Sequence, residues 1–182
     1  EELFIRIHDE YSRHYYDKES INYREKFIYS NIFKNEDFNN KSIAELACGS
    51  GFNSLAILKR FPNAKLNGYD ISQPACDDYK RIVKADAYIW DITKEKINNL
   101  KYDYVIVFGG LHHCINDLNS TFQNIFNMLN DNGKLIMVEP NKKFVFDFVR
   151  MIWYKIDNYF ESNTEDSLNH LKLLNIHKDK FK

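Results

Sequence analysis

The chain has 182 residues, which is long enough for one domain with a sizeable hydrophobic core. Its 25 basic and 26 acidic side chains nearly cancel, so the basic surface that nucleic-acid binding requires is not expected. No apolar run approaches the roughly 20 residues of a membrane-spanning helix, and we expect neither nucleic acid nor membrane as a partner. Cys48, Cys76 and Cys114 form no CxxC pair, which predicts reduced thiols in a cytoplasmic protein and no metal site.

The first 40 residues carry large apolar side chains at intervals of three and four, which predicts two amphipathic helices. We expect the helices to separate near residues 17–20, with Ser20 as the N-cap of the second helix. Residues 1–40 would form a helical cap, 41–140 the ligand-binding core, and 141–182 a C-terminal helical region on the acceptor side. All three belong to a single predicted domain, 1–182.

From residue 42 onwards, apolar strands alternate with helices. Because parallel strands need a crossover helix, this alternation predicts a doubly wound α/β sheet, mainly parallel, with helices on both faces. A further helix is expected at 144–160, and no convincing strand follows it, so the C-terminal strands of the sheet are expected to be incomplete. The expected strands are 42–47, 65–70, 87–92, 103–108 and 133–139, and the helices between them are 52–60, 74–82 and 117–130.

The central motif is a short strand that runs through Gly49-Ser50-Gly51 into a helix. Such a turn directs free backbone N–H groups at a ligand. A P-loop requires GxxxxGK[ST], which is absent. A dinucleotide site requires a third glycine where Ser54 stands, and Glu45 would repel a pyrophosphate. An acid before the turn instead favours a ligand that carries an ammonium group, and S-adenosylmethionine (SAM) has an ammonium, a sulfonium and a ribose.

The segment Glu45-x-Ala47-x-Gly49-x-Gly51 resembles motif I of the class I, Rossmann-like SAM-dependent methyltransferases of small molecules, with Ala47 in place of the first glycine. The resemblance covers residues 40–140. It implies that SAM is the cofactor and S-adenosylhomocysteine (SAH) the product. It also implies that Glu45 holds the ammonium, directly or through water, while the backbone of Ala47, Gly49 and Gly51 approaches the methionine part.

Two further acidic positions match the family in order. Asp70 ends the second strand roughly twenty residues after the glycines, where a carboxylate can accept both ribose hydroxyls and Ile71 would lie against the adenine. Asp86 and Asp91 compete for the adenine amino group. The spacing to the fourth strand favours Asp91, with Ile92 adding a backbone N–H.

The segment 108–114 leaves the fourth strand. By the resemblance, Phe108 lines the methionine and the residues after it face the methyl acceptor. An imidazole there could take a proton from the acceptor, so His112 and His113 are candidate catalytic residues. In the N-terminal segment, the resemblance implies that Tyr16 and Arg24 meet the methionine carboxylate.

The activity expected from these motifs is methyl transfer to an oxygen or nitrogen of a small polar metabolite or glycan precursor. The motif Asn-Pro-Pro-Tyr, typical of methyltransferases that act on DNA bases, does not follow the fourth strand. Two alternatives are an NAD-dependent oxidoreductase and a non-catalytic SAM-binding module.

Overall fold

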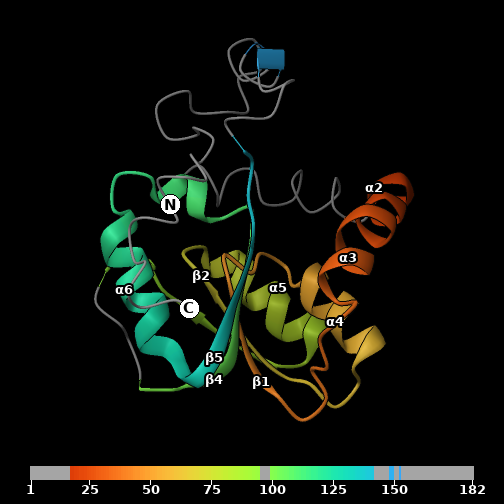
Figure 1. The fold of residues 1–182 in the computed structure, drawn as a ribbon, viewed down its shortest axis with the longest axis horizontal. Coiled ribbons are helices and arrows are strands. Elements are labelled where there is room, and N and C mark those ends of the chain that lie inside the picture. The colour runs from red at the N-terminus through yellow and green to blue at the C-terminus, as the bar shows by residue number, and fades with distance from the viewer. Residues whose placement is uncertain (1–16, 95–98, 142–147, 150–151, 153–182) are drawn as a thin grey trace.

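The computed structural model describes residues 17–94 and 99–141, together with 148, 149 and 152. Its sheet has five strands, all parallel, in the order β3-β2-β1-β4-β5. This order confirms the predicted doubly wound α/β fold, and Figure 1 shows the sheet with helices on its two sides. The strands are β1 (Ser42–Leu46), β2 (Lys65–Asp70), β3 (Asp86–Ile89), β4 (Tyr102–Phe108) and β5 (Leu129–Val138).

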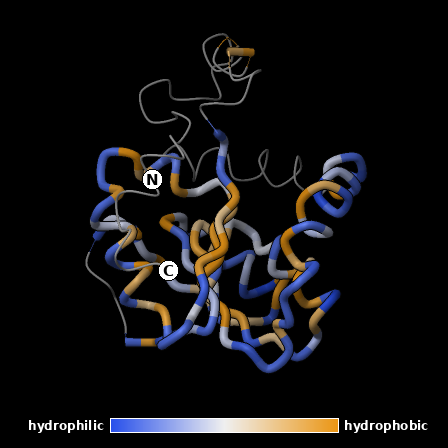
Figure 2. The backbone as a smooth tube through the Cα atoms, in the orientation of Figure 1, coloured by the Kyte–Doolittle hydropathy of each residue, from blue (hydrophilic) through white to orange (hydrophobic). Residues whose placement is uncertain are grey.

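Helices cover both faces of the sheet. The buried side chains form two clusters, one between the sheet and α6 and the other between the sheet and the helices η1, α4 and α5. Figure 2 shows the apolar segments of the central strands between these two layers. The helical elements are α2 (Lys18–Tyr23), η1 (Arg24–Tyr29), α3 (Ser30–Ile32), α4 (Phe52–Arg60), α5 (Gln73–Val83), η2 (Leu111–Cys114) and α6 (Leu118–Met128).

The N-terminal prediction is partly tested. Residues 1–16, and with them Tyr16 and the first predicted helix, lie outside the described residues. The helix that follows begins at Lys18, and its N-cap is Asp17, whose carboxylate accepts a hydrogen bond from the backbone N–H of Ser20 at 3.1 Å. The predicted cap at Ser20 is therefore wrong, because an acceptor three residues earlier already satisfies the first turn.

The third strand begins one residue earlier than expected and ends three residues earlier. Asp86 starts β3, pairs with Asn67 of β2 and is exposed. Asp91 therefore lies in the loop after β3, at the carboxyl edge of the sheet. This is the edge at which the predicted contact with the adenine amino group would be made.

The fifth strand also begins earlier, since Leu129 already pairs with Tyr102. Inside β5 the register against β4 shifts, and Asn132 has φ 63°. The preceding helix consequently ends at Met128 instead of residue 130.

Three residues of the predicted C-terminal helix lie within the described part of the chain. Residues 148, 149 and 152 are helical, in agreement with the helix expected at 144–160. The other residues of that helix, and all those after 152, lie outside the described residues, so the expected lack of last strands stays a prediction. Within the described part of the chain, no helix is both long and apolar enough to cross a membrane.

Candidate active site

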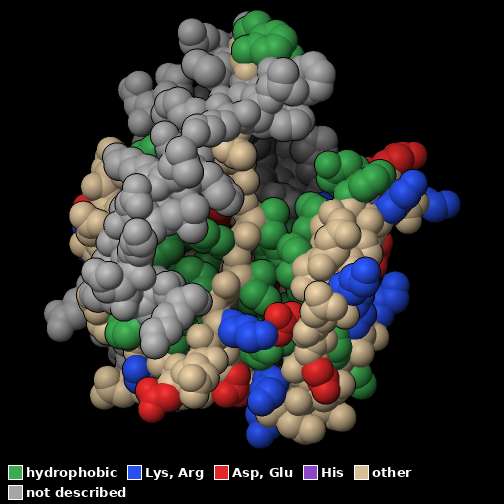
Figure 3. Space-filling view, in the orientation of Figure 1, with side chains coloured by type: hydrophobic (Ala, Val, Ile, Leu, Met, Phe, Trp, Pro, Cys, Tyr) green, Lys and Arg blue, Asp and Glu red, His purple; other side chains and the backbone are tan. Residues whose placement is uncertain are grey.

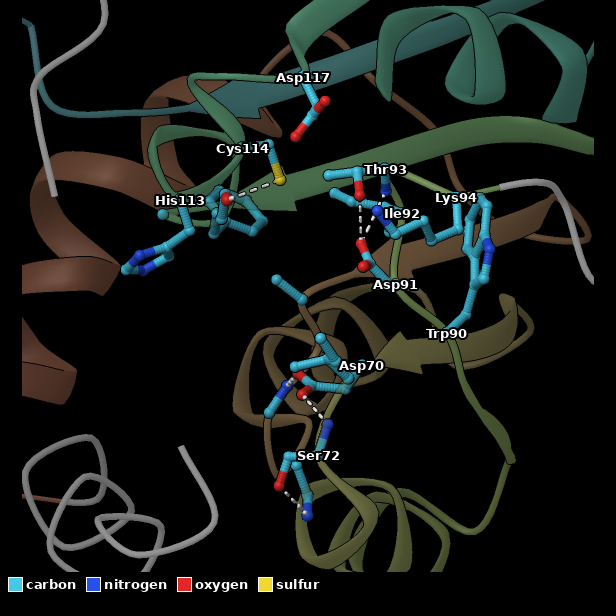
Figure 4. Close-up of a pocket in the computed structure, with 17 residues that line it drawn as sticks. Asp70, Ser72, Trp90, Asp91, Ile92, Thr93, Lys94, His113, Cys114 and Asp117 are labelled. Carbon is cyan, nitrogen blue, oxygen red and sulfur yellow. Dashed lines mark hydrogen bonds between the residues drawn. The ribbon is translucent and has the colours of Figure 1, made fainter. Parts of the chain in front are cut away.

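A cavity of about 380 Å³ lies at the carboxyl ends of β1 and β4, where the strand order of the sheet reverses. This switch point is where open α/β sheets bind ligands, and the volume falls in the range of small-molecule sites. Figure 4 shows the residues that converge on it from the loops after β2, β3 and β4. Of the predicted site residues, Ala47, Gly49, Asp70, Ile71, Asp91, Ile92, Phe108 and His113 line this cavity.

The loop between β1 and α4 has a backbone suited to glycine. Gly49 and Gly51 have φ of 51° and 85°, and Ala47 adopts 49°, a conformation that costs an alanine about 1 kcal/mol. A side chain on Gly51 would collide with Val83, whereas a Cβ on Gly49 would meet no atom within 4 Å. Gly51 is therefore required by packing, and Gly49 leaves open space at the cavity wall for a ligand.

Asp70 joins this loop to the end of β2. One carboxylate oxygen accepts from the N–H of Gly49 and the other from the N–H of Ser72, both at 2.9 Å. These bonds fix the carboxylate in the cavity wall. A carboxylate oxygen can accept more than one hydrogen bond, so this group is suited to the hydroxyl hydrogens of a ligand.

Asp91 is fixed in a similar way on the neighbouring loop. Its Oδ1 accepts from the N–H and the hydroxyl of Thr93, at 2.9 and 2.7 Å. The carbonyl of Ile92 accepts from Asn124 of α6 at 2.9 Å, which ties this loop to the helix layer. Asp86 starts β3 at the opposite edge of the sheet and does not line the cavity.

Glu45 lies behind the glycine loop and does not line this cavity. Because side chains alternate along β1, Glu45 faces α4 and is completely buried. Its carboxylate accepts from Asn53 Nδ2 at 2.8 Å and from the Ser54 hydroxyl. Burial raises the pKa of Glu45 to about 7, against the lowering effect of these two donors, and the nearby Asp70 charge raises it further.

The two candidate catalytic histidines have different surroundings. The His113 ring lines the cavity, and burial together with the neighbouring His112 lowers its pKa to about 3. His112 is buried, and its Nδ1 lies 2.9 Å from the carboxylate of Glu139, which follows β5. Glu139 also accepts the N–H groups of Gly110 and Leu111, at 2.9 and 2.8 Å.

Arg24 of η1 lies beside the glycine loop. Its guanidinium carbon is 4.6 Å from the centre of the Phe52 ring, and Phe52 directly follows Gly51. Arg24 is thus placed next to the predicted ligand loop, although it does not line the cavity described above. In the described part of the chain, no group of His, Cys, Asp and Glu side chains could hold a metal ion.

The cavity also contains residues that sequence reasoning missed. Some of them could have been found, because Ser72 and Thr93 each follow a predicted acid by two positions. Glu139, which does not line the cavity, had no such signal, because it is separated by 27 residues from the histidine that it contacts. The lining residues without a prediction include Ser72, Trp90, Thr93, Lys94, Cys114 and Asp117.

Comparisons with known proteins identify the family of this chain. Residues 44–135 match the family model described as a methyltransferase domain. Malonyl-[acyl-carrier protein] O-methyltransferase 1 of Ilyobacter polytropus is 31% identical over 110 residues, which are 58% of this chain and 40% of that protein. The chain thus spans less than half the length of this curated relative.

Two solved structures show the same fold. The structure of StiE O-MT has a TM-score of 0.60 at 22% identity and covers 79% of this chain and 55% of its own. The O-methyltransferase of a trans-AT PKS multienzyme of Brevibacillus brevis was solved in complex with SAH. It has a TM-score of 0.55 at 23% identity, and the match covers 74% of this chain and 47% of that one.

The glycine loop, the acids at the ends of β2 and β3 and the family match all fall in the same stretch of sequence. They confirm the resemblance to class I, Rossmann-like methyltransferases that use SAM. The chain belongs to the methyltransferase domain family.

Proposed function

We propose that this chain binds SAM and catalyses transfer of its methyl group to an oxygen of a small polar acceptor. The observation that carries the proposal is the arrangement of Asp70 and Asp91 on two neighbouring loops that open onto one cavity, next to the glycine loop. The open space at Gly49 and the two oriented carboxylates fit an adenosine group, whose ribose and amino group both offer hydrogen-bond donors. SAM would supply an activated methyl group on its sulfonium.

The residues of the chain would bind and orient the two reactants. Asp70 would accept the ribose hydroxyls, while Asp91 and the backbone of Ile92 would meet the adenine amino edge. Glu45 would supply negative charge behind the loop for the ammonium, and Arg24 would meet the carboxylate of the methionine part. Such positioning accounts for most of the acceleration when the donor is already activated.

An oxygen acceptor is supported by the relatives, since the curated relative and both solved structures are O-methyltransferases by name. It is also supported by the pair formed by His112 and Glu139. A carboxylate at Nδ1 accepts the Nδ1–H and leaves Nε2 as the acceptor, which is the tautomer that a general base needs. His113 lines the cavity and His112 does not, but His113 suits that role less, because an imidazole with a pKa of about 3 is a weak base.

A carboxylate acceptor is a second candidate. The relative from Ilyobacter polytropus is named for malonyl-[acyl-carrier protein]. A malonyl carboxylate is ionised at neutral pH and needs no base. The two candidates differ in their need for a base: a hydroxyl acceptor needs the imidazole of His112, whereas a carboxylate acceptor needs no imidazole.

The test is SAH release in the presence of hydroxyl and malonyl acceptors, with the wild type and His112→Gln. A hydroxyl acceptor predicts a loss of roughly 10²- to 10⁴-fold in the variant. A malonyl acceptor predicts almost no loss. Tight SAM binding with no SAH release from any acceptor would instead support a non-catalytic SAM-binding module.

A further inference from the structure

A chain of buried hydrogen bonds runs from the N-terminal helical segment to the acid behind the glycine loop. The Tyr29 hydroxyl of η1 donates to Asn53 Oδ1 at 2.7 Å, and Asn53 Nδ2 donates to Glu45 Oε1 at 2.8 Å. All three side chains are at most 4% exposed. The contact between η1 and α4 therefore continues, through one amide, to a carboxylate on β1.

A second chain reaches the same carboxylate from α5. The Ser54 hydroxyl donates to Glu45 Oε2, and the Tyr79 hydroxyl lies 2.7 Å from Ser54 Oγ. A serine has a single hydroxyl hydrogen, and Ser54 uses it on Glu45. Tyr79 is therefore the donor to Ser54, so both chains direct their hydrogens at the carboxylate.

The amide of Asn53 makes the first chain directional. An amide has one oxygen and one nitrogen, so the hydroxyl of Tyr29 on the oxygen keeps the nitrogen towards Glu45. Without that hydroxyl, the amide could turn and present its oxygen to the carboxylate. Two acceptors would then face each other in a buried site, which disfavours the ionised form of Glu45.

The same helical segment also touches the cavity. The Tyr29 ring lies edge-on to Phe108, a cavity residue, with ring centres 6.1 Å apart. Arg24, in the same element, covers Phe52 at the start of α4. The position of η1 is thus linked to the ligand loop at the residue after Gly51, at the end of β4 and, through Asn53, at Glu45.

We infer that Tyr29 is a positioning residue of the cofactor site. Through Asn53 it keeps a hydrogen-bond donor directed at the ionised carboxylate of Glu45, and it thereby couples the N-terminal helical segment to SAM binding. The inference rests on the proposed function, because it assumes that Glu45 supplies charge to the ammonium of SAM. It concerns the amino-acid part of the cofactor and leaves the adenosine part unaffected.

The experiment compares Tyr29→Phe with Tyr104→Phe by calorimetry. Tyr104 is a matched control, because its buried ring also carries a hydroxyl that donates to a side chain, Glu36, at 2.8 Å, away from the loop. The ligands are SAM and 5′-methylthioadenosine, which has the adenosine part but no ammonium. Tyr29→Phe should weaken SAM binding by roughly five- to twentyfold and leave methylthioadenosine within about twofold. Tyr104→Phe should change neither.

An equal loss for both ligands in Tyr29→Phe would show general damage to the site and overturn the inference, as would unchanged SAM affinity. A third variant, Asn53→Ala, tests the route. Adding Tyr29→Phe to Asn53→Ala should weaken SAM binding no further, whereas an additive loss would show that Tyr29 acts by another path. If the wild type itself binds methylthioadenosine and no SAM, the proposed function fails first, and this result is distinct from every outcome for Tyr29.

Discussion

Replacing Asp70 by alanine tests the proposed adenosine site most sharply. The carboxylate holds the N–H groups of Gly49 and Ser72, each at 2.9 Å, and would accept two ribose hydroxyls. A hydrogen bond to a charged group contributes about 1.5 kcal/mol or more. The two ribose bonds therefore amount to about 3 kcal/mol, or roughly a hundredfold in Kd.

The effect on stability should be smaller than the effect on binding. Asp70→Ala would release the N–H groups of Gly49 and Ser72, and water can replace the carboxylate at half-buried Gly49 but not at Ser72, which is 2% exposed. We expect the free energy of unfolding to fall by about 1 kcal/mol. Calorimetry with SAM and urea unfolding measure the two effects separately.

Asp86→Ala is the matched control, since this acid is exposed at the opposite edge of the sheet and should leave SAM affinity within about twofold. A folded Asp70→Ala protein that binds SAM as tightly as the wild type would refute the ribose assignment. An Asp86→Ala protein with a large loss would refute the choice of Asp91 over Asp86.

Three further predictions concern the loop and the acid behind it. Gly51→Ala should destabilise the protein by about 2 kcal/mol, because the new Cβ meets Val83 at a positive φ. Gly49→Ala should cost about 1 kcal/mol of stability but should weaken SAM binding, since its Cβ fills the open space at the cavity wall. The pKa of Glu45 is about 7 in the folded protein and 4.5 in the unfolded chain. Between these two pH values, folded Glu45 therefore holds a proton that the unfolded chain releases. Its contribution to stability is therefore present below pH 4.5 and is lost as the pH rises to about 7, and Glu45→Gln should remove this slope.

Each of these predictions has a clear contrary result. Gly51→Ala with wild-type stability in urea would show that α5 yields at Val83, and tight SAM binding by Gly49→Ala would place the ligand elsewhere. An equal pH slope in Glu45→Gln and the wild type, measured from pH 4 to 8, would show that another group titrates in that window.

The sheet and the glycine loop were predictable because their signals are local. The apolar runs and the helices between them determine a parallel order, and Gly49 and Gly51 mark a backbone that other residues rarely adopt. Asp70 and Asp91 could be placed because Asp70 ends β2, Asp91 follows β3, and the carboxyl ends of both strands meet the cavity. The preference for Asp91 over Asp86 depended only on the length of the link to β4.

The contacts that organise the site were not predictable, because they join distant parts of the chain. Nothing near Tyr29 indicates that its hydroxyl meets Asn53, and nothing in the sequence pairs Glu139 with His112. The cap at Asp17 was missed since both Asp17 and Ser20 are good N-cap residues, and only the geometry of the first turn chooses between them.

The most direct test of the central claim is calorimetric titration of the chain with SAM, SAH and NAD. The site described above predicts that SAM and SAH each bind in one-to-one ratio and that NAD does not bind, because Glu45 stands behind the loop where a pyrophosphate would lie. Binding of NAD without SAM or SAH would contradict the account.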